Sequence, residues 1–347
     1  MSKRGSFRTH PLLGGVAPLV CGFFLTCCTG GDSAPGQADS EIPSSDPELW
    51  EGDVAAAART LRPQGGTEED WEVFRATVTR AWEEGVETLP MGEAIVWFGL
   101  QFVGSPYRPG TLEVAGEEDV VVNFQGFDCV TLVENAVSLA RYVKSNPPEI
   151  LESQPQAREA YKRALRELRY RGGRVDGYPS RLHYFSDWIR DNEAKGLVVE
   201  VTRELGGEED LATIDFMTTH LESYRQLANR ANVMAIQETE AELSSLVRYK
   251  IPEEELQDRI SGIQSGDVIA ATSTVDGLDV AHTGLAYWQG SELHLLHAPL
   301  VGEVVEVSAR PLAERILRIQ GQDGIRVVRP LEPGVKADGE STGSSIP

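Results

Sequence analysis

The sequence predicts an α+β domain in which helices come first and an antiparallel sheet follows. Apolar residues recur at helical spacing in several segments of the first half of the chain. After residue 266 the pattern changes to short apolar or alternating runs that are broken by Gly, Asp and Ser. Helices and strands that are segregated along the chain in this way are typical of an α+β domain.

Residues 1–28 have the pattern of a lipoprotein-type signal peptide. Three basic residues and no acidic residue precede an apolar stretch at 11–25, which is short for a stable membrane anchor. The stretch ends in Leu-Thr-Cys-Cys, and Cys28, with Leu25 three residues before it, is the predicted lipidation site. Cys27 is the alternative site, and cleavage followed by free secretion is the alternative outcome.

Composition divides the rest of the chain into three parts. Residues 29–46 are rich in Gly, Ser, Pro and Asp and predict a flexible linker, 47–332 predict one domain with helical insertions, and 333–347 predict a disordered tail. The formal net charge is −22 and no basic stripe is present, which argues against nucleic acid as a partner. The domain holds one cysteine, Cys129, so it cannot form an intrachain disulfide.

The region before Cys129 predicts three helices and a strand. The helices are Glu51–Leu61, Glu68–Trp82 and one that begins at Met91 and ends near Gly104, and the short strand is Val120–Phe124. The segment Gly104-Ser105-Pro106-Tyr107 is a turn signal.

Cys129 lies where a turn runs into a helix. Asp128 is a good N-cap, and apolar residues repeat at helical spacing from Val130, so we expect a helix to about Val143. A helix N-terminus carries a partial positive charge and presents N–H groups, which lower the pKa of a thiol and can bind an oxyanion. Cys129 is therefore the candidate nucleophile, although a buried cysteine is more often a small apolar filler.

The middle of the chain predicts further helices. Ala157–Arg169 is a charged helix, and the aromatic and polar segment 178–192 predicts a helix whose inward face is formed by Leu182, Phe185, Trp188 and Ile189. A strand is predicted at Leu197–Thr202. The segment 203–259 is mainly charged and helix-prone.

The last part of the domain predicts an antiparallel meander that carries histidines. The predicted strands are Asp267–Thr272, Thr283–Trp288, Leu293–His297 and Val304–Val307. A thiol nucleophile needs a base and the base needs an orienting group, and His282 and His297 can fill these roles. His294 lies three residues from His297, so on a strand it should point to the opposite face and be exposed or structural.

No metal or other cofactor is expected. Strand geometry keeps His294 and His297 from facing one ion easily, and neither Cys-x-x-Cys nor His-Glu-x-x-His occurs.

The motifs resemble, in order, those of NlpC-type papain-fold cysteine hydrolases of the bacterial cell wall. The shared landmarks are Gly104-Ser105-Pro106-Tyr107, Phe127-Asp128-Cys129, Ser265-Gly266-Asp267-Val268-Ile269, His282-Thr283-Gly284 and His297-Ala298-Pro299. The narrower motifs Asp128-Cys129-Val130-Thr131, Arg181-Leu182-His183-Tyr184-Phe185 and the segment from Gly277 to Gly284 resemble the N-acetylmuramoyl-L-alanine amidase-like branch. The resemblance spans residues 90–330 and implies a papain-like α+β fold.

The resemblance also implies roles for individual residues. Cys129 would be the nucleophile, His282 the general base and acid, and His297 the polar residue that orients the imidazole. The implied substrate-side residues are Tyr107, Asp128, Arg181, His183 and Tyr184. The implied reaction is hydrolysis of the amide between N-acetylmuramic acid and L-alanine in peptidoglycan fragments, so that a sugar must fit beside the thiol.

One departure from the wider group bears on the substrate. Endopeptidases of that group usually have Ser-Gly after the cysteine and use the serine and the preceding aspartate to hold a free amino terminus, whereas this chain has Val130 and Thr131. The alternatives that stay open are a γ-D-glutamyl-diaminopimelate endopeptidase and a non-catalytic peptidoglycan-binding lipoprotein. We expect a monomer in the cell envelope that faces the periplasm or the exterior and contacts the membrane only through its lipid anchor.

Overall fold

The computed structural model describes residues 65–300 and 302–334, all of which belong to one compact unit. The predicted signal peptide with Cys28, the linker, the helix at Glu51–Leu61 and the tail beyond residue 334 lie outside the described residues. None of the described helices is both long enough and apolar enough to span a bilayer.

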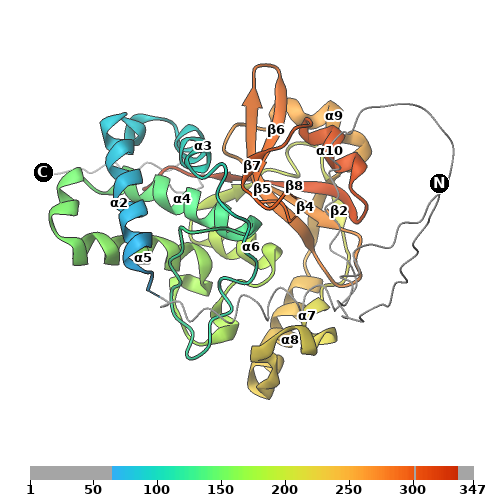
Figure 1. Cartoon of the computed structure of the whole chain (residues 1–347). Helices are drawn as coiled ribbons and strands as arrows, with labels where there is room; N and C mark the ends of the chain where they lie inside the picture. Colours follow the sequence, from blue (N-terminus) through green and yellow to red (C-terminus); the bar gives the residue numbers. More distant parts are fainter. Residues whose placement is uncertain (1–64, 301, 335–347) are drawn as a thin grey trace, which may run out of the picture. The chain divides into compact units, whose positions relative to one another are not determined.

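Of the helices predicted before the sheet, those among the described residues are confirmed, although the helix predicted within 178–192 begins only at Phe185, so that Leu182 lies before it. They are α2 (Glu68–Glu83), α3 (Met91–Gln101), α4 (Cys129–Ser145), α5 (Gln154–Arg169) and α6 (Phe185–Ala194) (Figure 1). Helix α4 packs against α3 and α5 within this layer, and it also packs against strand β5 of the sheet. This central position explains why α4 is almost entirely buried beyond its first turn.

The described strands form one eight-stranded sheet. They are β1 (Val198–Glu200), β2 (Glu208–Asp210), β3 (Arg248–Pro252), β4 (Val268–Ser273), β5 (Val280–Gln289), β6 (Glu292–His297), β7 (Glu306–Val307) and β8 (Gln322–Pro330). Their order is β2-β3-β8-β4-β5-β6-β7, with β1 beside β8, and all pairs are antiparallel. The predicted meander β4 to β7 is confirmed, and the unpredicted β8 inserts between β3 and β4.

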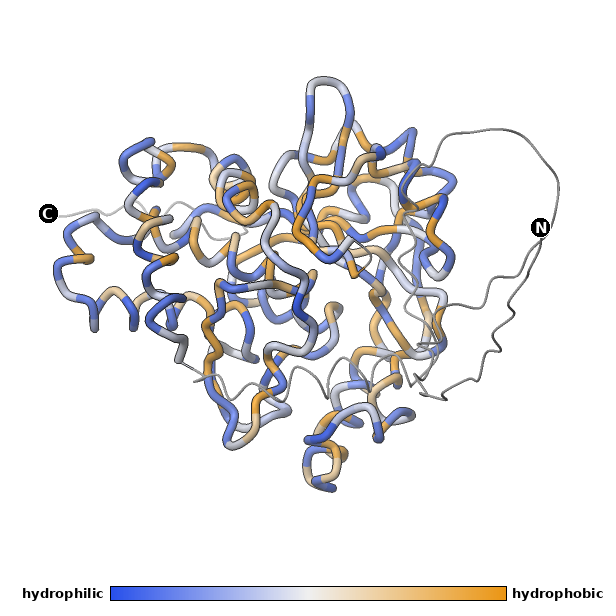
Figure 2. Tube along the Cα trace, in the orientation of Figure 1, coloured by the Kyte–Doolittle hydropathy of each residue, from blue (hydrophilic) through white to orange (hydrophobic). Residues whose placement is uncertain are grey.

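Apolar side chains cover both faces of this sheet. One cluster joins Val268, Leu285 and Leu296 to the helices α2 to α6, and a second joins Ile269 and Leu295 to α9 (Leu256–Arg259) and α10 (Leu312–Arg318). In Figure 2 the central strands are largely orange, whereas many outer turns of the helices are blue. Because both faces are covered, the central strands carry short continuous apolar runs, such as Val268-Ile269-Ala270-Ala271 in β4.

The predicted strand at Val120–Phe124 is wrong. The segment is buried, but it pairs with no strand among the described residues. Its backbone bonds to side chains instead, because Phe124 N–H donates to Asp70 Oδ1 at 2.8 Å and Arg169 Nη1 donates to the Val121 carbonyl at 2.7 Å. An apolar run indicates that a segment is buried, but it does not show that the segment pairs as a strand. Here side chains form the hydrogen bonds that the buried backbone groups need, without a neighbouring strand.

The segment predicted to be mainly helical, 203–259, is only partly so. It forms α7 (Phe216–Thr219), α8 (Arg230–Ser244) and α9, but also β2 and β3, which extend the sheet. Helices α7 and α8 share a small apolar cluster of their own with Tyr178 and Tyr184.

Candidate active site

Cys129 is the first residue of α4, and its side chain is half-buried. The helix begins in a capping box: Thr131 N–H donates to Asp128 Oδ1 at 2.8 Å, and Asp128 N–H donates to Thr131 Oγ1 at 2.9 Å. The sequence prediction of a helix capped by Asp128 is therefore confirmed. The capping box fixes the first turn of α4, and thus the thiol, against the loop that precedes it.

The Asp128 carboxylate is engaged by its own helix. Besides the N–H, the Thr131 hydroxyl donates to Oδ1 at 2.8 Å. Burial raises the pKa of Asp128, and the two hydrogen bonds from Thr131 act in the opposite direction. Thr131 therefore occupies one oxygen of the carboxylate that was expected to face the substrate.

His282 and His297 meet across β5 and β6. His282 Nε2 lies 3.0 Å from His297 Nδ1, and the two rings are nearly perpendicular at 87°. Both side chains are buried, with residue exposures of 7% and 1%. Since one nitrogen of such a contact donates and the other accepts, each ring fixes the tautomer of the other.

Gly284 makes this contact possible. It continues the register in which Leu285 pairs with Leu296, so it lies opposite His297. A Cβ at Gly284 would lie only 2.9 Å from His297 Cβ, closer than real Cβ contacts allow. The glycine that follows His-Thr in the sequence motif therefore leaves the room that His297 Cβ and the Leu295 side chain occupy.

His294 has different contacts from His297. Its Nδ1 lies 2.8 Å from the Ser308 carbonyl, and its Nε2 lies 3.8 Å from Glu292 Oε2. The side chain is buried, with 7% exposure. These are structural contacts at the edge of β6, which agrees with one of the two expectations for this residue.

Tyr107 joins the cysteine segment to the turn before β7. It forms an isolated bridge with Phe127, two residues before Cys129, and its N–H donates to the Glu303 carbonyl at 2.7 Å. Glu303 has a φ of 60°, a left-handed conformation that few residues other than glycine adopt. The segments that carry Cys129 and β7 therefore meet around Tyr107, whose side chain is half-buried.

Glu306 is a candidate site residue that sequence reasoning missed. In the β6–β7 pairing it lies directly opposite His297, and its Oε1 is 3.8 Å from His297 Nε2. A carboxylate at this distance favours the charged form of an imidazole. The alternating run at Val304–Val307 was recognised as a strand, but only the register of pairing puts Glu306 opposite the histidine.

Arg181 is buried in a separate set of ion pairs. Its Nη2 lies 2.5 Å from Glu113 Oε1, its Nε lies 3.4 Å from Glu118 Oε1, and its guanidinium lies 5.1 Å from the ring centre of Tyr178. Both acidic residues belong to the loop between α3 and α4. Arg181 therefore ties that loop to the start of the segment before α6.

His183 and Tyr184 also contact protein groups. His183 Nε2 lies 2.9 Å from the Tyr178 carbonyl, and burial, with help from the Arg181 charge, holds the pKa of His183 well below its usual value. Tyr184 donates to Glu240 Oε1 at 2.6 Å and accepts the N–H of Met217 at 2.8 Å. None of these named contacts involves Cys129 or His282.

Within residues 65–300 and 302–334, no group of three or more His, Cys, Asp or Glu side chains is arranged to hold a metal ion.

Glu134, one turn beyond the thiol, lies 2.6 Å from Arg169, and both side chains are 2% exposed. Glu134 is therefore a buried acceptor that Arg169 satisfies.

The chain is similar to proteins of one family. Residues 97–324 match the AmiA-like family, described as N-acetylmuramoyl-L-alanine amidase-like. The crystal structure of an N-acetylmuramoyl-L-alanine amidase from Bacteroides uniformis is 34% identical, with a TM-score of 0.63 over 70% of this chain and 99% of that one. No curated protein matches the chain.

Two further structures are similar. A Bacteroides fragilis protein that is provisionally named a xylanase is 38% identical, with a TM-score of 0.61 over 67% of this chain and 98% of that one. A Legionella pneumophila protein is 22% identical, with a TM-score of 0.56 over 77% of this chain and 97% of that one, and it supports the fold alone.

Proposed function

Because the chain belongs to the N-acetylmuramoyl-L-alanine amidase-like family, we propose that it is a cysteine-dependent amidase of peptidoglycan fragments. The bond that we propose is the amide between N-acetylmuramic acid and L-alanine. We also assign the fold to the papain-like NlpC type. The observation that carries the proposal is the contact of 3.0 Å between His282 Nε2 and His297 Nδ1. The strand of His282 packs against helix α4, which begins at Cys129, the one cysteine of the domain.

The histidine contact supports a division of roles. If His282 Nε2 carries the shared proton and donates to His297 Nδ1, then His282 Nδ1 is left to accept the proton of the Cys129 thiol. His297 Nε2 then carries a proton toward the Glu306 carboxylate, 3.8 Å away. A carboxylate behind the second imidazole would stabilise positive charge on the pair during the reaction.

The reaction follows in two halves. The Cys129 thiolate attacks the lactyl carbonyl carbon, and His282 gives its proton to the alanine nitrogen as the C–N bond breaks and a thioester forms. Water then attacks the thioester while His282 accepts its proton, which releases the lactyl carboxylate and the thiol. We propose the Cys129 N–H, at the start of α4, as a donor to the oxyanion of both steps.

The capping box supports the amidase bond over the endopeptidase bond. An endopeptidase of the wider group would use Asp128 and a serine at position 130 to hold a free amino terminus. Here position 130 is Val130, and Thr131 bonds Asp128 Oδ1 through both its N–H and its hydroxyl. A site with these features is less suited to binding an ammonium group. This agrees with a substrate whose L-alanine nitrogen is still acylated and therefore carries no positive charge.

Defined muropeptides test the proposal. The full chain is incubated with a muramyl tetrapeptide and with the free tetrapeptide, and the products are weighed by mass spectrometry, with xylan as a control polymer. Release of the intact peptide from the sugar supports the amidase. Cleavage between D-glutamate and diaminopimelate would instead make the protein an endopeptidase, and binding without cleavage would make it a peptidoglycan-binding protein.

We further propose that the protein is an envelope lipoprotein attached through Cys28 and that its domain is monomeric. The sequence pattern around Cys28 is the support for the anchor. Labelling of growing cells with a fatty acid should mark the wild-type chain and not Cys28→Ser. If Cys28→Ser is labelled as strongly as the wild type, the anchor lies elsewhere.

A further inference from the structure

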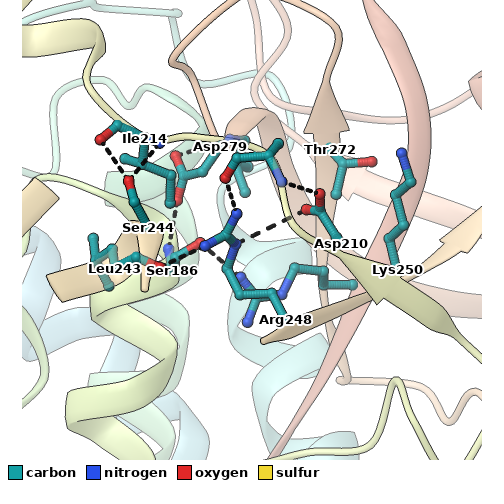
Figure 3. Close-up of polar contacts among 12 residues, drawn as sticks. Ser186, Asp210, Ile214, Leu243, Ser244, Arg248, Lys250, Thr272 and Asp279 are labelled. Carbon is teal, nitrogen blue, oxygen red and sulfur yellow. Dashed lines mark hydrogen bonds and ion pairs between the residues drawn. The ribbon is translucent and has the colours of Figure 1, made fainter. Parts of the chain in front are cut away.

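Helix α6 is capped by a residue from a distant part of the chain. Its N-cap residue, Tyr184, makes no capping hydrogen bond, and tyrosine is not among the side chains that cap helices well. The N–H of Ser186, in the first turn, donates to Asp279 Oδ2 at 2.7 Å (Figure 3). A carboxylate 93 residues away in the sequence therefore supplies the cap.

Asp279 also fixes the start of β5. Its other carboxylate oxygen, Oδ1, accepts the N–H of Val280 at 2.8 Å, and its carbonyl accepts the N–H of Ser273 at 3.3 Å. One residue thus joins the first turn of α6, the end of β4 and the first residue of β5. It lies three residues before His282.

Between Asp279 and His282 the strand is irregular. Ala271 pairs with His282, whereas the next residue of β4, Thr272, pairs with Val280, so Ala281 is an extra residue in β5. A β-bulge of this kind bends the strand and redirects nearby side chains. The direction of the His282 ring therefore depends on how the bulge is held, and Asp279 holds its N-terminal side.

The partner of Asp279 is itself held firmly. Arg326 Nη1 donates to Ser186 Oγ at 2.7 Å, and the same guanidinium forms two hydrogen bonds of 2.9 Å with Glu200. Arg326 is 4% exposed, so solvent competes little for these bonds. Strand β8 thus fixes Ser186 through its hydroxyl. The N–H that donates to Asp279 therefore belongs to a residue whose position is set by the sheet.

We propose that Asp279 is a positioning residue for His282. By capping α6 and anchoring the start of β5, it holds the bulge at Ala281 in the form that brings the His282 imidazole against His297. The effect on turnover rests on the proposed function, whereas the effect on the conformation of β5 does not.

The test compares three variants of the full chain. Asp279→Ala removes the acceptor of both Ser186 and Val280, and Asp279→Asn keeps one side-chain oxygen for the Ser186 N–H and so keeps the helix cap. Thr67→Ala is the matched control, because Thr67 caps α2 by a bond of 3.2 Å to Asp70 N–H. Each variant is measured for its melting temperature, for kcat and KM on a muramyl peptide, and for amide exchange at Val280–Thr283.

We expect kcat of Asp279→Ala to fall at least about tenfold with KM within about twofold, because misplaced groups slow the chemical step more than binding. Thr67→Ala should lose similar thermal stability and keep its kcat, and Asp279→Asn should lie between wild type and Asp279→Ala. Equal losses of kcat in Thr67→Ala and Asp279→Ala, or an unchanged kcat in Asp279→Ala, would overturn the proposal.

Amide exchange separates this inference from the proposed function. If the wild-type chain cleaves no muropeptide, the proposed function fails, but exchange at Val280–Thr283 still decides the positioning role. Faster exchange there in Asp279→Ala, and not in Thr67→Ala, supports the role. Exchange at the wild-type rate in Asp279→Ala shows that the anchor is not needed.

Discussion

Two buried polar regions of this protein differ in how their charges are matched. Around Arg248 and Arg326, positive groups are surrounded by carboxylates and carbonyls. Arg248 Nη1 donates to the Leu243 carbonyl at 2.5 Å (Figure 3), and Arg326 forms two hydrogen bonds with Glu200. His282 and His297 are two weak bases that contact each other, and the strand of His282 packs against the helix that begins at Cys129. The first arrangement is suited to holding elements in place, and the second to moving a proton.

The largest effect should come from the thiol. Cys129→Ala should lower turnover of a muramyl peptide by roughly 10³-fold or more, because no other group can form the thioester. The half-buried side chain leaves little cavity, so the melting temperature should change by only a few degrees. Residual turnover above that level in purified Cys129→Ala would show that the thiol is not the nucleophile.

The two histidines of β6 give the next contrast. His297→Ala should lower kcat by roughly 10²-fold, because the orienting partner of His282 is lost. His294→Ala removes the contacts with the Ser308 carbonyl and with Glu292, neither of which involves His282, and should keep most of the activity. Comparable losses in the two variants would contradict the choice of His297 as the third residue.

A substitution in the ion-pair region should act on stability instead. Arg248→Met removes the donor to the carbonyls of Leu243 and Ala212 and the partner of Asp210 at 3.9 Å. We expect the free energy of unfolding to fall by about 2–4 kcal/mol, because buried acceptors lose their partner. Urea unfolding measures this loss, and kcat of the folded variant should stay within about threefold of wild type. A loss of kcat without a loss of stability would assign Arg248 to the active site.

The smallest effect concerns pH. Because burial holds the pKa of His183 well below its usual value, the unfolded state binds the proton first as the pH falls. Stability from this group is present above about pH 6.5 and is lost below it, by at most about 1.4 kcal/mol per pH unit. His183→Gln keeps a donor for the Tyr178 carbonyl and cannot titrate, so its unfolding free energy should fall less steeply between pH 6.5 and 5. Equal slopes would mean that folding does not lower the pKa of His183.

The sequence predicted the elements whose signals are local. The capped start of α4 at Asp128 and the meander β4 to β7 could be recognised because capping residues and alternation lie within a few positions of each other. The choice of His297 over His294 followed from the His-Ala-Pro motif and stays a prediction; in the structure His297 contacts His282, whereas His294 contacts the Ser308 carbonyl.

Features that depend on distant partners could not be predicted in this way. The place of β8 between β3 and β4, the register that puts Glu306 opposite His297, and the capping of α6 by Asp279 all join segments far apart in the sequence. The buried run at Val120–Phe124 was misread for the same reason, since its partners are the side chains of Asp70 and Arg169. Secondary-structure propensity is a property of a single segment, whereas each of these contacts depends on two segments that are distant in the sequence.

The missing side chain at Gly284 has a practical use. A single methyl group there would lie 2.9 Å from both His297 Cβ and the Leu295 side chain, so the side chain of the orienting histidine or its neighbour would have to shift. Under the proposed function, Gly284→Ala is therefore a candidate for a variant that binds muropeptides but cleaves them slowly, and such a variant would serve to capture complexes with intact ligands.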